Sequence, residues 1–330
     1  MIAQGIQGTR VQTYQRYNLL FNQALQWVVF TYQAIAMIVF VASLFIATRW
    51  MQRPFLGAFY EHTMVFNGTG PTTSSPEWGL FEQVVLGDQL IAINATPVKN
   101  DADVQSVLQN FFPGETVTLT VRSENGQERD LDIVLHPFSS SSRFTQFIIP
   151  SILSFIFLVV SLWIFGLRRN EPAGRAFSLF TSSLAIITGA YFNLVTTHEF
   201  TMIWTLACAM SGGALCDLAL SFPQEPRIVI NRPYLRWLGI LFALILTLVT
   251  IPNLFNFQRP TAYIQNWQII YGFVAVSILF YVGMNLYHAM YAPSPVIKTQ
   301  SRTILYGAIL AFLPMSIWLE SQDCSVQNGA

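Results

Sequence analysis

The most informative stretch of the chain is GDQLIAINATPV at residues 87–98. Residues 103–112 follow it, and their apolar side chains have the spacing of an amphipathic helix. Residues 117–135 then alternate apolar and polar side chains on either side of an Asn-Gly pair at 125–126, which is the pattern of a two-stranded hairpin. These patterns predict a small folded domain that contains strands and one helix.

The order of these elements resembles the second half of a PDZ domain, which usually reads G-D-x-I-x-x-I-N-G, then P-V, a helix and two closing strands. PDZ domains bind the C-terminal carboxylate of a peptide on the backbone of a loop, and the peptide pairs with the strand that follows. The nearest match to that loop is FLGAF at residues 55–59, with residues 60–66 as the strand. The resemblance implies that the following residues bind a peptide or protein C-terminus: Leu56, Gly57, Ala58, Phe59, Val104, Val107 and Leu108.

The sequence departs from the PDZ pattern in two places. Ala95 follows Asn94 where the family usually has glycine, and residues 67–76, rich in Gly, Thr, Ser and Pro, lengthen a loop beside the expected groove. The alternative reading is a PDZ-shaped spacer that packs on the outer face of the membrane and binds nothing.

Composition places the rest of the chain in a membrane. Of 330 residues, 53% are hydrophobic and 10% are charged, against about 25% charged in ordinary soluble domains. The net charge is zero, which argues against a nucleic-acid partner. Seven apolar runs have about the length that a helix needs to cross a bilayer, and they lie at residues 28–48, 147–167, 176–196, 202–222, 237–257, 267–290 and 303–319.

We therefore expect an α-helical polytopic membrane protein with one extracytoplasmic PDZ-like α+β domain. The expected parts are a cytoplasmic tail (1–27), a first transmembrane helix (28–48), the outer domain (53–137), a six-span block (147–319) and a polar tail (320–330). The short loops after the second, fourth and sixth spans carry eight Lys and Arg, whereas the short loops after the third and fifth spans carry only Arg259. This difference places the first set of loops and the N-terminus in the cytoplasm of a bacterial cell.

This order of parts resembles the sensor region of ComP-type quorum-sensing histidine kinases, which belong to two-component systems. DLALSFP at residues 217–223 looks like the His-x-x-Leu-x-Phe-Pro ending of spans in that family, with Asp217 at the His position, and residues 298–314 resemble a later span. The resemblance implies a signal-input module. Seven spans leave residues 320–330 outside the cell, so we expect a receptor that lacks its kinase output domain.

Asp217 is the one acidic residue inside an apolar run, and such a group faces the bundle interior or water. Its depth predicts a polar switch with His288 and Arg175 near the cytoplasmic face. The alternative is a structural hydrogen-bonded pair or a carboxylate that reaches toward the water at the membrane surface. The sequence contains no nucleotide-binding motif and indicates no cofactor, no metal site and no catalytic residue.

Two other classes of function remain open. An intramembrane protease or a protease regulator is the first, because Ser211 follows Ala209-Met210 and precedes Gly212, as in serine nucleophile motifs, and His288 lies on a later span. A metalloprotease lacks support, since His198-Glu199 has no second histidine at helical spacing. A PDZ membrane scaffold is the second alternative, and the sequence leaves a homodimer open.

Overall fold

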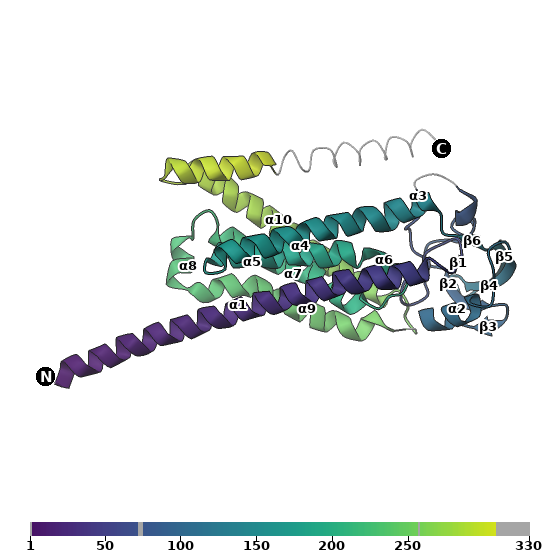
Figure 1. The fold of residues 1–330 in the computed structure, drawn as a ribbon, viewed down its shortest axis with the longest axis horizontal. Coiled ribbons are helices and arrows are strands. Elements are labelled where there is room, and N and C mark those ends of the chain that lie inside the picture. Colours follow the sequence, from purple (N-terminus) through teal and green to yellow (C-terminus); the bar gives the residue numbers. More distant parts are fainter. Residues whose placement is uncertain (1, 72–74, 257, 308–330) are drawn as a thin grey trace.

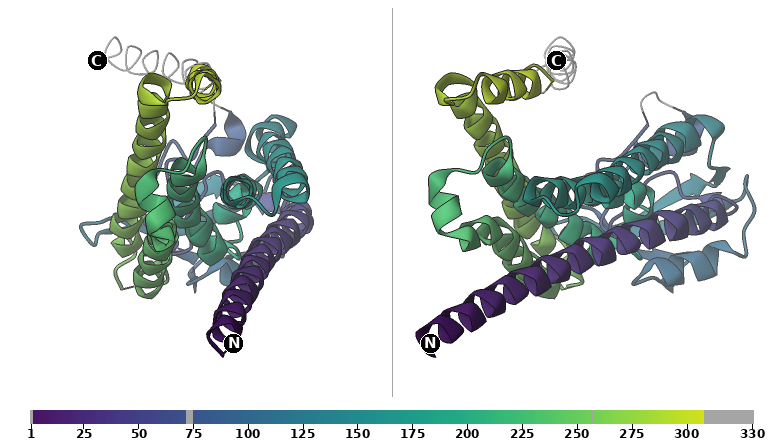
Figure 2. Two further views of the ribbon diagram at one scale, coloured as in Figure 1. Left: turned by 90° about the vertical axis from the view of Figure 1, so that its left-hand side faces the viewer. Right: turned by 60° about the vertical axis from the view of Figure 1, so that its left-hand side comes forward.

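The computed structural model describes residues 2–71, 75–256 and 258–307, with side chains from residue 22 onward. Long helices lie side by side in a bundle, and a small domain with a sheet sits at one end of it (Figure 1). The long helices are α1 (Ile2–Trp50), α4 (Ile149–Arg168), α5 (Pro172–Gly189), α7 (Thr201–Ser221), α9 (Leu238–Leu254) and α10 (Ala262–Tyr291). α1 and α10 lie on opposite sides of the bundle (Figure 2).

Five helical segments are long and apolar enough to cross a membrane: Asn22–Trp50, Ser140–Arg168, Thr201–Ser221, Pro233–Leu254 and Ala262–Tyr291. Their most apolar stretches have a mean hydropathy between 1.5 and 2.5. Each corresponds to one of the seven runs predicted from the sequence. The structure is that of a helical protein compatible with several membrane crossings.

The other two predicted spans differ from these five. The third, at 176–196, is the helix α5 followed by the single turn α6 (Tyr191–Leu194). α5 is too polar to count as a span by composition, yet it runs between the same two ends of the bundle as α4 and α7 (Figure 1). Of the seventh, at 303–319, only residues 303–307 are described, and they are helical together with residues 295–302.

The bundle has small polar residues between helices and apolar residues outside. On α4, Ser154 and Ser161 are buried, and their hydroxyls donate to the carbonyl oxygens of Ala185 (2.7 Å) and Ser178 (2.9 Å) on α5. The opposite face of α4 exposes large apolar side chains such as Phe155 and Trp163. Hydroxyls that bond across close helix contacts are a common feature of membrane bundles.

α7 lies at the centre of the bundle, and most of its side chains are buried. Gly213 allows this, since a Cβ atom there would lie 2.8 Å from the carbonyl oxygen of Gly239 at the start of α9. A Cβ atom at Gly212 would lie 2.9 Å from the ring of Phe273 on α10. The small residues of this segment therefore form the close helix-packing face that their spacing indicates.

The small domain contains an antiparallel sheet in the order β3-β2-β4-β5. Its strands are β2 (Gln89–Ile93), β3 (Thr96–Pro97), β4 (Thr116–Arg122) and β5 (Glu128–Val134). The predicted hairpin is β4–β5, with Gly126 at φ 83° in the turn. The predicted helix is α2 (Asp101–Leu108), which is shorter than the pattern indicates and begins where the Asn100 side chain accepts from the Asp103 N–H.

Two short strands, β1 (Pro54–Phe55) and β6 (His136–Pro137), pair antiparallel and bring the two ends of the domain together. The single turn η1 (Pro76–Trp78) packs beside them. After β6 the chain enters α3 (Ser140–Arg143) and the π-helical turn η2 (Phe144–Ile148), which continue into α4. The domain is thus joined to the bundle through adjacent chain ends.

The structure corrects one expectation for this domain. Residues 60–66 do not form an extended strand, because the segment folds back on itself with an isolated bridge between Tyr60 and Phe66. Met64 sits at the turn with φ 64°, and its N–H donates to the Glu61 carbonyl. A local turn replaces the strand edge that a peptide would extend.

Candidate functional site

An aromatic cluster joins the small domain to the helical bundle. Phe55, Phe59 and Trp78 come from the domain, and Trp50 and Phe192 come from the ends of α1 and α6. The ring centroids of Trp50 and Phe192 are 5.3 Å apart, and those of Phe59 and Phe192 are 6.3 Å apart. Edge-to-face contacts of this kind add stability beyond the buried area, so the domain is seated on the bundle.

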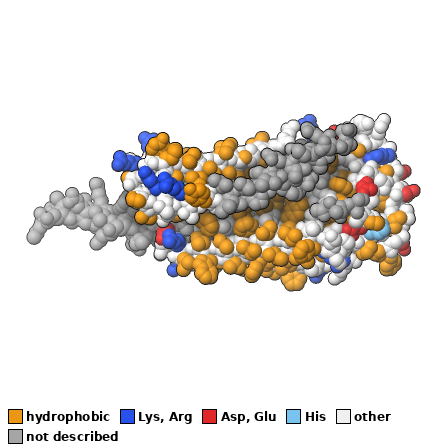
Figure 3. Space-filling view, turned by 90° about the horizontal axis from the view of Figure 1, so that it is seen from above, with side chains coloured by type: hydrophobic (Ala, Val, Ile, Leu, Met, Phe, Trp, Pro, Cys, Tyr) orange, Lys and Arg blue, Asp and Glu red, His pale blue; other side chains and the backbone are white. Residues whose placement is uncertain are grey.

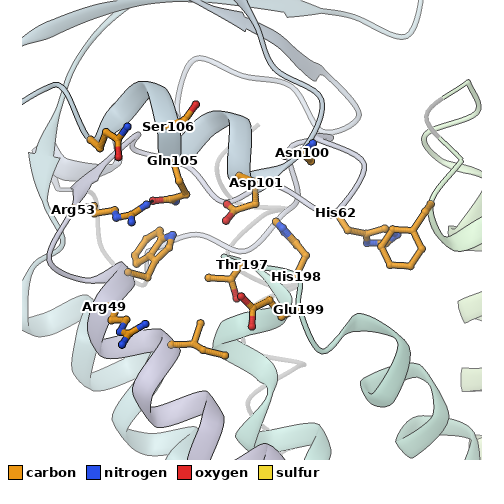
Figure 4. Close-up of a pocket in the computed structure, with 15 residues that line it drawn as sticks. Arg49, Arg53, His62, Asn100, Asp101, Gln105, Ser106, Thr197, His198 and Glu199 are labelled. Carbon is orange, nitrogen blue, oxygen red and sulfur yellow. Dashed lines mark hydrogen bonds between the residues drawn. The ribbon is translucent and has the colours of Figure 1, made fainter.

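Beside this cluster a cleft of about 740 Å³ opens between the domain and the bundle. We call it the junction cleft. Its walls come from the end of α1, from the first turns of α2 and from the segment that precedes α7 (Figure 4). The polar and charged residues that line it include Arg49, Arg53, Asp101, Gln105, His198 and Glu199.

Asp101 is held at the cleft wall by hydrogen bonds. Its Oδ1 accepts from the Tyr60 hydroxyl at 2.8 Å, while Arg53 donates to the side-chain oxygen of the neighbouring Gln105. Burial raises the pKa of Asp101 to about 6, although the hydrogen bonds from Tyr60 and Gln105 and the charge of Arg53 oppose that shift. The carboxyl group is therefore mostly ionised at pH 7.

His198 faces Asp101 from the other side of the cleft (Figure 4). Its Nε2 lies 2.8 Å from the Tyr60 carbonyl oxygen, which can only accept, so Nε2 carries the proton. The buried Nδ1 is then a bare acceptor, and it has no partner among the described residues. Burial lowers the pKa of His198 to about 3, which keeps the ring neutral at physiological pH.

The His62 side chain packs against aromatic residues at the end of the bundle that carries the domain. Its ring centroid lies 5.2 Å from that of Phe255, 4.6 Å from that of Tyr263 and 6.0 Å from that of Trp267. The side chain is buried, its Nδ1 lies 4.0 Å from Glu61 Oε2, and neither ring nitrogen makes a close hydrogen bond with a described residue. Burial lowers the pKa of His62 to about 4. The adjacent Thr63 hydroxyl donates to the Pro260 carbonyl at 2.9 Å, which fixes this segment on the loop before α10.

The residues that the PDZ resemblance assigned to peptide binding lie close together, but in the interior of the domain. Leu56, Ala58, Val104 and Leu108 are buried in one core cluster, with Val107 half-buried against it. Phe59 instead belongs to the aromatic cluster at the junction. These side chains contact one another and do not line an open groove.

Gly57 lies in the loop expected to bind a carboxylate, and it has φ 95°. A Cβ atom there would lie 3.1 Å from the Leu80 backbone nitrogen, and the Gly57 carbonyl accepts from the Phe81 N–H. The residues after η1 thus occupy the space beside this loop. Peptide binding at these positions stays a prediction.

Within the bundle, Asp217 pairs with Arg236, a residue that the sequence analysis did not assign to it. Arg236 Nε lies 2.9 Å from Asp217 Oδ1, and the Ser221 hydroxyl donates to the same oxygen at 3.1 Å. Arg236 lies in the turn η3 (Pro233–Trp237) just before α9 and also pairs with Glu225 at 3.3 Å. The one sequence signal for this pair is that Arg236 lies in the loop that follows α7.

The other two residues of the predicted switch do not bond to Asp217. Arg175 donates to the carbonyl oxygens of Arg169 and Asn170, and its charge acts on Asp217 without an ion pair within 4.0 Å. His288 is buried near the end of α10, and its Nδ1 has no partner among the described residues. Asp217 is thus hydrogen-bonded through Arg236 and Ser221, and its role as a switch stays a prediction.

Ser211 and His288 lie at different depths in the bundle. Ser211 is at the middle of α7, where the neighbouring Gly212 faces Phe273 and Ser277 of α10. His288 is eleven residues beyond Ser277, which is roughly 16 Å further along the helix. The Ser211 hydroxyl donates to the Cys208 carbonyl of its own helix at 2.7 Å. These two side chains do not form a nucleophile and base.

The comparisons with known proteins leave the family open. No known family model matches the chain, and no curated protein matches it significantly. In the described part of the chain, no group of three or more His, Cys, Asp or Glu side chains is arranged to hold a metal ion. The candidate functional site is accordingly the junction cleft together with the buried histidines beside it.

Proposed function

We propose that this protein is a membrane-embedded signal-input module, the sensor part of a bacterial two-component receptor, with a PDZ-like outer domain that binds a peptide or protein C-terminus. The observation that supports it best is the aromatic cluster of Trp50, Phe59 and Phe192. A domain tethered by a flexible linker could bind a partner without affecting the membrane helices. A domain packed on the helix ends cannot move without changing that packing.

The mechanism is a shift between two packings of the bundle. A peptide that binds beside α2 has to separate side chains such as Leu56 and Val104, which pack in one core cluster in this structure. A ligand shifts an equilibrium only by its differential affinity for the two states. Because opening the core costs free energy, we expect micromolar binding, on the order of −8 kcal/mol.

The distribution of charge supports an orientation with the outer domain outside the cell. Lys and Arg gather at the end of the bundle away from the domain, apolar side chains cover the middle, and most visible acidic side chains lie on the domain (Figure 3). Lys and Arg near helix ends favour the cytoplasmic side. We propose six crossings within the described residues, namely the five apolar segments and α5. Because α5 is buried between α4 and α7, its hydroxyl groups do not have to face lipid.

Peptide binding is tested with an unbiased library of peptides with free C-termini and the full chain in detergent. Val107→Lys places a charge on the half-buried face of α2, so it should weaken binding by roughly tenfold. Gln127→Lys, in the exposed β4–β5 turn, is the matched control. A library without binders would contradict the peptide-binding part of the proposal.

Coupling is tested with spin labels at Ile230 and Tyr291, which are exposed at the end of the bundle away from the domain. The three native cysteines are first replaced by alanine. A saturating peptide should change the distance distribution between the labels, and Phe192→Ala should abolish that change while leaving peptide binding intact. An unchanged distance in the parent protein would contradict the sensor function.

A further inference from the structure

The junction cleft carries opposite charges on different walls. Arg49 and Arg53 come from the end of α1 and the residues after it, while Asp101 begins α2 and Glu199 precedes α7. In the described part of the chain, no ion pair within 4.0 Å joins either arginine to either carboxylate, and the side chains of Arg49 and Glu199 are exposed to the cleft. Arg53 reaches the α2 side of the cleft, where its charge acts on Asp101, while the charges of Arg49 and Glu199 are exposed to the cleft.

The acidic wall also contains an unused acceptor. His198 is 92% buried. Its proton is on Nε2, so Nδ1 is an acceptor, and no described residue donates to it. A buried polar atom without a hydrogen bond is costly unless a ligand or water satisfies it. Asp101 accepts from Tyr60 and Gln105, and its two carboxylate oxygens still leave further acceptor capacity. Asp101, Glu199 and His198 thus offer three acceptors, and a primary ammonium has three donors.

The basic wall suits a compact anion. A guanidinium binds a carboxylate or a phosphate through two parallel N–H groups, and two such groups here are four residues apart in the sequence. Arg53 already donates to Gln105, which orients it along this wall. The Arg49 guanidinium makes no hydrogen bond or ion pair with another described residue, so its donors are available to a ligand.

We propose that the junction cleft binds a small zwitterion, with its primary ammonium among Asp101, Glu199 and His198 and its anionic group between Arg49 and Arg53. The cleft volume of about 740 Å³ is within the range of small-molecule sites. Two sources share this chemistry. One is a free amino acid, and the other is the headgroup of phosphatidylethanolamine, since the cleft adjoins the ends of α1 and α9, at the level of lipid headgroups. This site does not depend on the proposed signalling function.

The test uses the full chain in phosphatidylcholine nanodiscs. Alanine, β-alanine and O-phosphoethanolamine are titrated by calorimetry, each beside its N-trimethylated analogue, which keeps both charges but lacks N–H donors. In parallel, the midpoint of thermal unfolding is compared between nanodiscs with and without phosphatidylethanolamine. We expect binding of the primary ammonium compounds, a higher midpoint with phosphatidylethanolamine, or both, and no binding of the trimethylated analogues.

Variants locate the site. Arg49→Gln and Glu199→Gln remove exposed charges from the two walls and should each weaken binding by roughly tenfold without loss of folding. Arg227→Gln, at the other end of the bundle, and Glu124→Gln, in the β4–β5 turn, are matched exposed controls and should bind as the parent does. Binding of soluble zwitterions identifies a free amino acid, and an effect confined to phosphatidylethanolamine identifies the lipid. No binding in either arm, or full binding by both cleft variants, would overturn the proposal.

Discussion

Arg236 Nε lies 2.9 Å from Asp217 Oδ1, and this ion pair joins the end of α7 to the turn that leads into α9. Both side chains are largely buried, with 12% of Arg236 and 5% of Asp217 exposed. A charge buried in a bundle is tolerated when a partner and further hydrogen bonds compensate it, and Ser221 and Glu225 supply those bonds. The pair therefore fixes the relative position of α7 and α9.

The pair predicts that Asp217→Leu destabilises the protein more than Ser211→Ala does. Removing Asp217 leaves Arg236 without its closest partner, which should cost about 3 kcal/mol, whereas Ser211 donates only to a carbonyl of its own helix, a bond worth about 1 kcal/mol. Unfolding of purified protein in mixed micelles measures both. Asp217→Leu combined with Arg236→Met should recover much of the loss, and additive losses in this double-mutant cycle would contradict a coupled pair.

Glu61 predicts a pH-dependent difference between the parent and Glu61→Gln. Burial raises the pKa of Glu61 from 4.5 to about 7, so the folded protein takes up a proton between pH 7 and pH 4.5 that the unfolded chain does not. Stability from this group therefore rises as the pH falls. Glu61→Gln should be more stable than the parent at pH 8 by up to about 3 kcal/mol and equal to it below pH 4.5. If Glu61→Gln and the parent differed in free energy of unfolding by the same amount at both pH values, the prediction would be wrong. Glu124→Gln, which changes an exposed residue, is the control.

The pKa shift of His62 predicts the opposite dependence of stability on pH. Burial lowers the pKa of His62 from 6.5 to about 4, so the unfolded chain takes up a proton first and stability falls as the pH drops from 6.5 to 4. His62→Phe should retain stability at pH 7, because neither ring nitrogen is hydrogen-bonded. Between pH 6.5 and pH 4, the free energy of unfolding of this variant should fall by up to about 3 kcal/mol less than that of the parent. His136→Phe, in β6, is the matched control, and equal acid sensitivity of all three proteins would refute the effect.

Residues 53–137 should fold without the helices, because the sheet and α2 enclose a core of their own. We expect a mixed α/β circular dichroism spectrum and dispersed amide signals. The isolated domain should also self-associate and bind a hydrophobic dye, since separation exposes Phe55, Phe59 and Trp78, which the full chain covers. Sedimentation velocity measures the association. A random-coil spectrum would contradict the domain boundaries.

Local patterns in the sequence predict much of this fold. Apolar runs mark the five segments long enough to cross a membrane, and the Asn-Gly pair between two alternating stretches marks the β4–β5 hairpin. Both predictions are correct because residues close together in the chain determine these elements. A helix in lipid needs a continuous apolar surface, and a tight turn needs a residue that tolerates positive φ. Residues 60–66 fail as a strand because alternation does not reveal a chain that folds back at Met64.

The sequence by itself determined which segments are long and apolar enough to cross a membrane, because hydropathy over about 20 residues is enough to mark such a helix. Only the tertiary structure decided which residues meet at the junction. Tyr60 and His198 are 138 residues apart, yet His198 Nε2 lies 2.8 Å from the Tyr60 carbonyl oxygen. Arg236 reaches Asp217 from the turn η3 in the same way. Such contacts depend on how the domain is seated on the helix ends and how the helices pack, and no periodicity along the chain encodes either.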